Sequence, residues 1–331
     1  LGRADAAVIA GDSKQMPPSS FGQLAVEEQD DVEAEFQVVA DEESILTEAV
    51  HAGVNRLWLS WHYRSQDESL IAFSNAAYYE GRLSSFPAHP AQVHDTGVSF
   101  TRVPGTFLRS RRTRTVAAPA VARAPLPGPQ DAPGPQDAPL AQTPDHDKVL
   151  LRTNPVEAAA VVAEVLRRWS SRERSIGIVT FNIQQRGLIE QMLWDSGVDG
   201  VAESLAARTD GLFVKNLENV QGDERDVILF STGFSVNEDG VLPLNFGPLN
   251  RSGGERRLNV AVTRAQRRVM VFSSFDPEDL RVAETSSTGI RDLRRYLRRS
   301  LHAPRGRLRR DPARRYLPCV GDAERGRRRL L

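Results

Sequence analysis

Short apolar runs alternate with longer amphipathic segments through the second half of this 331-residue chain, and this alternation restricts the fold more than composition or charge does. The apolar runs lack a polar residue at every second position, which is typical of strands buried on both faces. They are SIGIVTF (175–181), LFVKNL (212–217), DVILFSTGF (226–234) and RRVMVFSS (267–274). Helices are predicted at 154–169, 183–197 and 255–266. Alternation at these lengths predicts an α/β fold with a mostly parallel sheet covered by helices on both faces.

The first third of the chain contains elements of the same kinds. Strands are predicted at 8–10, 56–65 and 97–107, and helices at 42–50 and 67–79. Gly81 is expected to stop the second of these helices, because glycine tolerates the backbone that ends a helix. The acidic segment 24–44 is interpreted as solvated surface.

Two segments have a composition that does not favour a packed core. Residues 108–147 are rich in Arg, Ala and Pro and repeat GPQDAP at 128–139, so a flexible, disordered linker is expected there. Residues 286–331 are predicted to form a helix at 290–301 followed by an Arg-rich tail, which either binds phosphates non-specifically or is disordered.

Charge and cysteine content narrow the class of protein. The 43 basic and 43 acidic residues cancel, so net charge favours no partner. The one cysteine, Cys319, excludes an internal disulfide framework and a Cys-rich metal site. No apolar run approaches the roughly 20 residues that a membrane span needs. We therefore expect a cytoplasmic protein without a membrane partner.

Four short polar segments each end a predicted strand or open a helix. They are GDSKQ (11–15), HYRS (62–65), VQGDERD (220–226) and LNVAVTRAQ (258–266). Each segment alone is also compatible with a surface turn or a structural ion pair, so each is modest evidence. Their order along the chain makes the set more specific than its members.

In this order the segments resemble the motifs of superfamily 1 helicases, in the branch that includes RNA-surveillance and five-prime-to-three-prime DNA helicases. GDSKQMPP resembles motif III and WHYRSQDESLIAFSNAAYYEGRL motif IV. VTFNIQQR resembles a nucleic-acid-contacting segment, NLENVQGDERDVILFST motif V and RRLNVAVTRAQRRVMVF motif VI. The resemblance extends from residue 1 to about 277 and implies a RecA-like fold of the P-loop NTPase type.

The resemblance also implies roles for individual residues in ATP hydrolysis. Arg64 and Arg264 match two arginine fingers, whose guanidinium groups stabilise charge that develops on the γ-phosphate. Gln15 has an amide suited to contact both the γ-phosphate and the attacking water. The nucleotide-contacting positions are Asp12, Gly222 and Glu224, supported by Gln221, Asn259 and Thr263.

A second group of residues is expected to contact single-stranded DNA or RNA. Thr180, Asn182 and Arg186 lie where a predicted strand meets a helix N-terminus, a place suited to hold a phosphate. Ser231 and Thr232 follow the next strand along the sheet. Phe181 is better interpreted as a buried aromatic residue than as a base-stacking one.

Complete enzymes of this family bind ATP and Mg²⁺ between two RecA-like lobes. The Gly-Lys-Ser/Thr phosphate loop of the first lobe does not occur in this sequence, and no Asp-Glu pair precedes Gly11. We therefore expect a first lobe, or a separate polypeptide that carries it, as a partner. The chain alone is expected to bind neither ATP nor Mg²⁺ tightly and to be inactive. No metal ligand is assigned.

These expectations divide the chain into five parts. Residues 1–24 would be the end of the first lobe, 42–107 and 148–285 the second lobe, 108–147 the linker, and 286–331 the helix and tail. The chain would then be the truncated C-terminal motor half of a helicase. The alternatives are a nucleic-acid-binding remnant without a motor and an unstable product without function.

Overall fold

A parallel five-stranded sheet forms the centre of the protein, in the order β3-β7-β6-β4-β5. The computed structural model describes residues 6–17, 44–87, 96–108, 152–207, 210–236 and 240–302. The strands are β3 (Gly97–Arg102), β4 (Ile176–Thr180), β5 (Phe213–Asn216), β6 (Arg225–Ser235) and β7 (Ala265–Ser274). This RecA-like α/β architecture confirms the predicted fold class.

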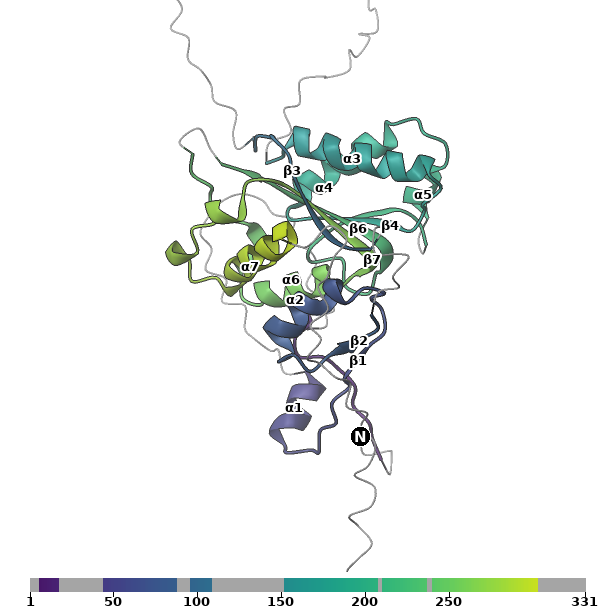
Figure 1. Cartoon of the computed structure of the whole chain (residues 1–331). Helices are drawn as coiled ribbons and strands as arrows, with labels where there is room; N and C mark the ends of the chain where they lie inside the picture. Colours follow the sequence, from purple (N-terminus) through teal and green to yellow (C-terminus); the bar gives the residue numbers. More distant parts are fainter. Residues whose placement is uncertain are drawn as a thin grey trace, which may run out of the picture.

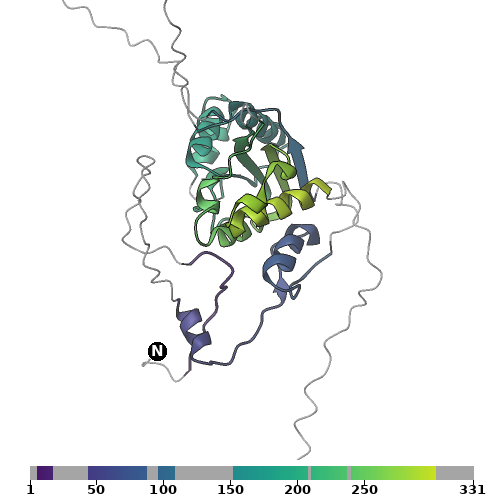
Figure 2. The same ribbon diagram turned by 90° about the vertical axis from the view of Figure 1, so that its left-hand side faces the viewer.

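Helices cover both faces of the sheet (Figure 1). One face packs against α2 (Glu68–Tyr78), α6 (Gly254–Val262) and α7 (Thr288–His302). The other packs against α3 (Pro155–Ser170), α4 (Ile183–Trp194) and α5 (Val201–Ala206). The central strand β6 contributes Ile228 and Phe230 to the first core and Leu229 to the second. Figure 2 shows the same layers from the side.

Three helices begin at side chains that the sequence places correctly. Asn154, Asp67 and Asn182 each accept a hydrogen bond from a backbone N–H in the first turn of α3, α2 and α4. This satisfies one of the N–H groups that a helix start leaves without an intrahelical partner. Gly81 adopts a positive φ of 71° and donates its N–H to Asn75 O at 2.9 Å, so it ends α2 as predicted.

Four predicted elements differ from the structure. The strand predicted at 97–107 ends at Arg102. Residues 8–10 are not a strand, and the Val8 side chain is 97% exposed, because no neighbouring strand among the described residues offers a hydrogen-bonding edge. In the predicted strand 56–65, only β1 (Trp61–His62) pairs, with β2 (Ser84–Ser85). The helix predicted at 255–266 ends at Val262, since the next residues turn into β7.

Other elements are shorter or were not predicted. The first helix is α1 (Ile45–His51), within the predicted range and capped by Ser44. Unpredicted elements are β2, α5 and the 3₁₀ helices η2 (Gly247–Leu249), η3 (Pro277–Asp279) and η4 (Val282–Glu284). In the part of the chain that is described, no helix has the length and apolar character needed to cross a membrane.

The predicted linker is flanked by two residues that meet in space. Leu108 N donates to Thr153 O at 2.8 Å, and the pair forms an isolated antiparallel bridge. Residues 109–151 lie outside the described part of the chain. Because its flanks are adjacent, this segment is an insertion into one lobe and does not separate two domains.

Two glycine substitutions test how tightly the sheet packs. A Cβ on Gly177 in β4 would lie 2.3 Å from Phe213 Cζ, whereas a Cβ on Gly187 in α4 meets nothing within 4 Å. We expect Gly177→Ala to lower the unfolding free energy by about 1–3 kcal/mol through overpacking. Gly187→Ala should raise it by about 0.5–1 kcal/mol, because alanine favours a helix. Urea unfolding measures both, and equal effects would contradict the tight β4–β5 packing.

Candidate functional site

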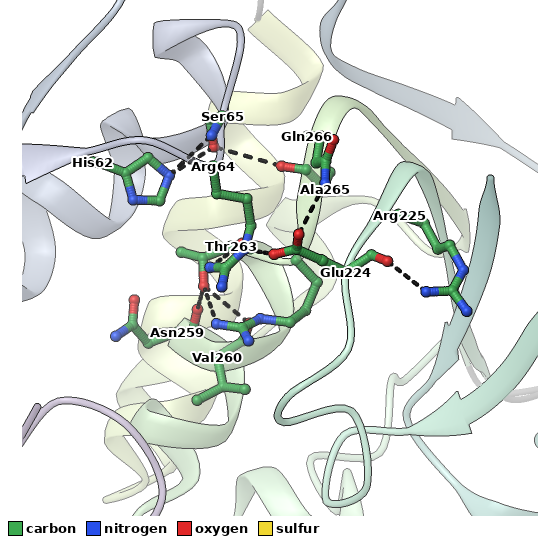
Figure 3. Close-up of polar contacts among 11 residues, drawn as sticks. His62, Arg64, Ser65, Glu224, Arg225, Asn259, Val260, Thr263, Ala265 and Gln266 are labelled. Atoms are coloured by element: carbon green, nitrogen blue, oxygen red, sulfur yellow. Dashed lines mark hydrogen bonds and ion pairs between the residues drawn. The ribbon is translucent and has the colours of Figure 1, made fainter. Parts of the chain in front are cut away.

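Arg64, Glu224 and Gln266 come from distant parts of the chain and form the centre of a polar site (Figure 3). Arg64, which precedes α2, places Nε 2.6 Å from Glu224 Oε2. Gln266 in β7 donates Nε2 to Glu224 Oε1 at 3.0 Å. The hydrogen bond from Arg64 is the main cause that lowers the pKa of Glu224. The segment before α2 is thereby joined to the amino ends of β6 and β7.

Arg264 is the second predicted arginine and is almost completely buried, with 3% of its surface exposed. Its Nε donates to Val260 O at 2.8 Å, and Nη2 donates to Thr263 Oγ1 at 3.2 Å. Arg64 Nη1 donates to the Thr263 carbonyl at 3.3 Å, so both arginines meet at one residue. Among the described residues no carboxylate forms an ion pair with Arg264. Burial and the nearby charge of Arg64 lower its pKa to about 10.

His62 belongs to this site, although the sequence analysis did not select it. His62 Nε2 lies 2.8 Å from Ser65 Oγ and accepts the Ser65 N–H at 3.3 Å. Burial is the main cause that lowers the pKa of His62 to about 4, and Arg64 and Arg264 lower it further. The imidazole is therefore neutral at pH 7 and fixes the turn that carries Arg64. His62 is part of the motif HYRS, but nothing in the sequence distinguished it from the other residues of that motif as a site residue.

The loop with the first predicted residues lies against the same helix, α6. Gln15 Nε2 donates to Asp12 Oδ2 at 2.9 Å. The Asn259 side chain in α6 donates to Lys14 O at 2.8 Å, so the loop approaches the element that leads to Arg264. Gln221 Nε2 reaches Met16 O at 3.4 Å from the other side. The structure thus brings five of the predicted nucleotide-site residues, Asp12, Gln15, Gln221, Asn259 and Arg264, to one region.

The remaining predicted nucleotide-site residues have defined places. Gly222 has a φ of +95° in an open turn, where a Cβ would meet nothing within 4 Å. This backbone favours glycine, because side-chain residues rarely adopt it. Thr263 Oγ1 donates to Asn259 O at 2.9 Å as it accepts from Arg264, so it connects the end of α6 to the arginine.

Three of the predicted nucleic-acid residues are buried. Thr180, Ser231 and Thr232 have no exposed surface. The Thr180 hydroxyl donates to Asn182 O at 2.9 Å. In this conformation these hydroxyls are not available at the surface. Asn182 and Arg186 are partly exposed at the start of α4, where Asn182 Oδ1 accepts the Gln185 N–H at 2.7 Å.

A buried carboxylate that was not predicted from the sequence holds two of these hydroxyls, those of Ser231 and Thr232. Glu157 in α3 accepts from Ser231 Oγ at 2.8 Å, from Gly233 N at 2.7 Å and from Ser274 Oγ at 2.9 Å. Burial raises its pKa to about 7, although these hydrogen bonds oppose the shift. Glu157 therefore ties α3 to the carboxyl ends of β6 and β7. One feature of the sequence could have indicated a buried carboxylate. Glu157 lies on the face of α3 that alanine and valine otherwise occupy.

A pocket of about 260 Å³ opens at the carboxyl ends of the strands. Its polar lining comes from Arg152, Asn182, Gln184, Asn216, Glu218 and Asn245, and Phe107 and Phe234 form an apolar part. Asn182 Nδ2 is buried, and no acceptor for it is found among the described residues. Amide groups and aromatic faces are the chemistry that binds nucleobases. Within the described ranges, no group of three or more His, Cys, Asp or Glu side chains is suited to hold a metal ion.

A family model described as an AAA domain matches residues 42–276. The chain belongs to this AAA-domain family. The match includes Arg64, Glu224 and Arg264, so the polar site lies within the part that defines the family.

The chain is also similar to curated ATP-dependent helicases. It is 32% identical over 321 residues to the uncharacterized ATP-dependent helicase MG140 of Mycoplasma genitalium, covering 90% of this chain and 23% of the relative. It is 32% identical over 312 residues to the MG140 homologue of Mycoplasma pneumoniae, covering 88% of this chain and 23% of that relative. The chain therefore spans about a quarter of the length of these relatives, and the comparisons support a helicase-like, ATP-dependent family.

One solved structure matches part of the chain. It is the C-terminal domain of a possible DNA helicase from Lactobacillus plantarum WCFS1, at 16% sequence identity and a TM-score of 0.26. The match covers 38% of this chain and 73% of that structure. At this TM-score the likeness carries no argument about the site.

Glu157 predicts a pH-dependent stability for the AAA domain. Its pKa is about 7 in the fold against an ordinary 4.5, so the folded state binds the proton more tightly than the unfolded chain does. This tighter proton binding adds to the free energy of unfolding in full below about pH 4.5, and the added stability is lost as the pH rises towards about 7. Glu157→Gln should therefore gain on the order of 3 kcal/mol of unfolding free energy relative to the parent across that window. Urea unfolding at a series of pH values measures the difference.

His62 provides a control of opposite sign. Its pKa of about 4 in the fold lies below the ordinary 6.5, so the parent gains stability as the pH rises between these values. His62→Gln should lose stability relative to the parent over this range. A difference between Glu157→Gln and the parent that stays constant with pH would show that Glu157 does not titrate abnormally.

Proposed function

We propose that this AAA domain is the second RecA-like lobe of an ATP-dependent superfamily 1 helicase motor and supplies two arginine fingers to an ATP site. The observation that carries the proposal is the buried Arg264 next to Arg64. Arg168, another buried arginine of this lobe, is by contrast paired with acids: it is 5% exposed and contacts Glu164 at 2.8 Å and Glu173 at 2.5 Å. Arg264 contacts a carbonyl and a hydroxyl oxygen.

The charges around Arg264 favour an anionic ligand. The two guanidinium groups share one paired carboxylate, Glu224, while the other acid whose charge acts on Arg264, Asp223, is paired with Lys215. This leaves local positive charge, and the burial of Arg264 removes water that would screen it. A γ-phosphate placed here would receive paired hydrogen bonds from guanidinium groups. We propose that Glu224 holds Arg64 before nucleotide binds and contacts the ribose afterwards. Gln15 would orient the attacking water, with Asp12 and Gly222 near the nucleotide.

The remaining parts of the ATP site would come from another lobe. A phosphate loop and a Mg²⁺ ligand pair are needed for hydrolysis and are not part of this sequence. We propose that a first RecA-like lobe provides both, and that ATP and Mg²⁺ bind tightly only when it is present. Residues 1–24 would belong to that lobe. Opening and closing of the two lobes would move the motor along a strand.

We propose that single-stranded DNA or RNA binds at the carboxyl ends of the strands. Ligands of open parallel sheets bind at this edge, and the start of α4 directs backbone N–H groups towards it. Asn182 and Arg186 would contact a phosphate, and the pocket beside them would accept a base. The buried residues Thr180, Ser231 and Thr232 would not contact the nucleic acid. They would hold Asn182 and the end of β6 in place. A nucleic-acid-binding remnant without a motor would use the same surface.

ATP hydrolysis tests the motor. The purified chain should show no Mg²⁺-dependent ATPase activity, and activity should appear when it is combined with the part of the Mycoplasma genitalium helicase that it does not match. In that mixture Arg264→Ala or Arg64→Ala should reduce kcat by about 10³-fold or more. Arg299→Ala, which removes an exposed arginine of α7, serves as the control. Activity of the isolated chain that Arg264→Ala abolishes would disprove the requirement for a first lobe.

Salt-dependent binding tests the nucleic-acid surface. Fluorescence anisotropy with labelled oligo-dT and oligo-U measures affinity at several salt concentrations. Arg186→Ala should reduce the slope of log K against log salt by about 0.7, because one phosphate contact is lost. Arg167→Ala lies at the opposite end of the fold, in the last turn of α3, and should leave the slope unchanged. Equal slopes for the parent and both variants would place the nucleic-acid surface elsewhere.

A further inference from the structure

One phenol hydroxyl connects the loop that carries Gln15 to the helix that leads to Arg264. Tyr79, directly after α2, donates to Asp12 Oδ2 at 2.7 Å. The same hydroxyl accepts from Asn259 Nδ2 in α6 at 2.9 Å. The bonded residues are 67 and 180 positions away from Tyr79 in sequence, so the hydroxyl joins three separate segments.

The connection continues on both sides of the hydroxyl. Asp12 Oδ2 also accepts Gln15 Nε2 at 2.9 Å, so one carboxylate oxygen binds both the phenol and the amide. Asn259 Nδ2 also donates to Lys14 O at 2.8 Å. The loop is thus attached to α6 by a side-chain route through Tyr79 and by a direct backbone contact. Both routes end at Asn259, which is one helical turn before Thr263 and Arg264.

The surroundings of Tyr79 favour a fixed, protonated phenol. Its side chain is 8% exposed, and burial together with the hydrogen bond to Asp12 raises its pKa. The hydroxyl is therefore a donor at neutral pH. Because Asp12 holds the amide nitrogen of Gln15, Oε1 is the atom that this side chain presents to an attacking water.

We propose that Tyr79 is a positioning residue that docks the Gln15 loop on the second lobe in register with Arg264. The inference rests on the proposed ATPase for its catalytic consequence, whereas docking itself is a property of this chain. A water-orienting amide and an arginine finger must face the same phosphate, and they come from segments about 250 residues apart. A rigid link between them reduces the loss of conformational freedom that assembly of the site requires.

The neighbouring tyrosine provides a matched control. Tyr78 is also a partly buried phenol at the end of α2, and its hydroxyl donates to Asp292 Oδ2 in α7 at 3.0 Å. Tyr78→Phe and Tyr79→Phe each remove one oxygen and keep the ring. If Tyr79 were only a packing residue, the two variants would affect residues 11–16 equally.

Hydrogen exchange in the full chain tests docking without nucleotide. Tyr79→Phe should make the backbone amides of residues 11–16 exchange at least tenfold faster, and trypsin should cleave after Lys14 faster. Tyr78→Phe should leave both rates unchanged. Asp12→Ala, which lies outside the core, provides a second variant should Tyr79→Phe fail to fold. It should give at least the same increase, because it also removes the hydrogen bonds from Lys14 N and Gln15 Nε2. The double variant should exchange no faster than Asp12→Ala, because the Tyr79 link is already broken there.

Kinetics in the mixture with the rest of the helicase test the catalytic consequence. Tyr79→Phe should lower kcat about tenfold and leave KM for ATP unchanged, since the phenol acts on Gln15 and not on nucleotide binding. Unchanged exchange in Tyr79→Phe and Asp12→Ala would overturn the proposal and leave the ATPase intact. Faster exchange with an unchanged kcat would overturn the catalytic part. Absence of ATPase in the parent mixture would instead refute the proposed function.

Discussion

The central strand β6 is the constraint on which the rest of the structure depends. It runs from Arg225 to Ser235 between β4 and β7 and is buried along almost its whole length. Its side chains supply both hydrophobic cores, so helices must cover both faces of the sheet. Glu224 precedes its first residue and Ser231–Gly233 lie near its end. One buried strand therefore positions two polar regions at opposite edges of the sheet.

The two edges differ in the chemistry that burial produces. At the amino ends of β6 and β7, burial leaves Arg264 as a cation held by neutral oxygen atoms. At the carboxyl ends, burial surrounds Glu157 with hydroxyl and amide donors and raises its pKa. The first arrangement favours an external anion, and the second satisfies the carboxylate internally. This contrast is why the arginine carries the proposed function and the glutamate has a structural role beneath the proposed nucleic-acid surface.

Much of the fold could be predicted because its signals are local. The caps Asn154 and Asp67 and the apolar runs of β4, β6 and β7 place these elements within a few residues of their observed ends. Prediction failed where the secondary structure of a segment depends on contacts with another segment of the chain. Val8–Ala10 has strand-like residues without a described partner strand, and the apolar spacing of α6 continues past Val262 although the chain turns into β7.

The sequence by itself determined the alternation of strands and helices, the family motifs and the identity of the charged residues at strand ends. These depend on spacing along one segment and on the chemistry of single side chains. Only the tertiary structure decided which groups meet: Arg64 with Glu224, Tyr79 with Asp12 and Asn259, and Glu157 with Ser231. It also decided that Ser231 and Thr232 are buried. Contacts and burial between distant segments follow from the order of strands in the sheet, which no local pattern encodes.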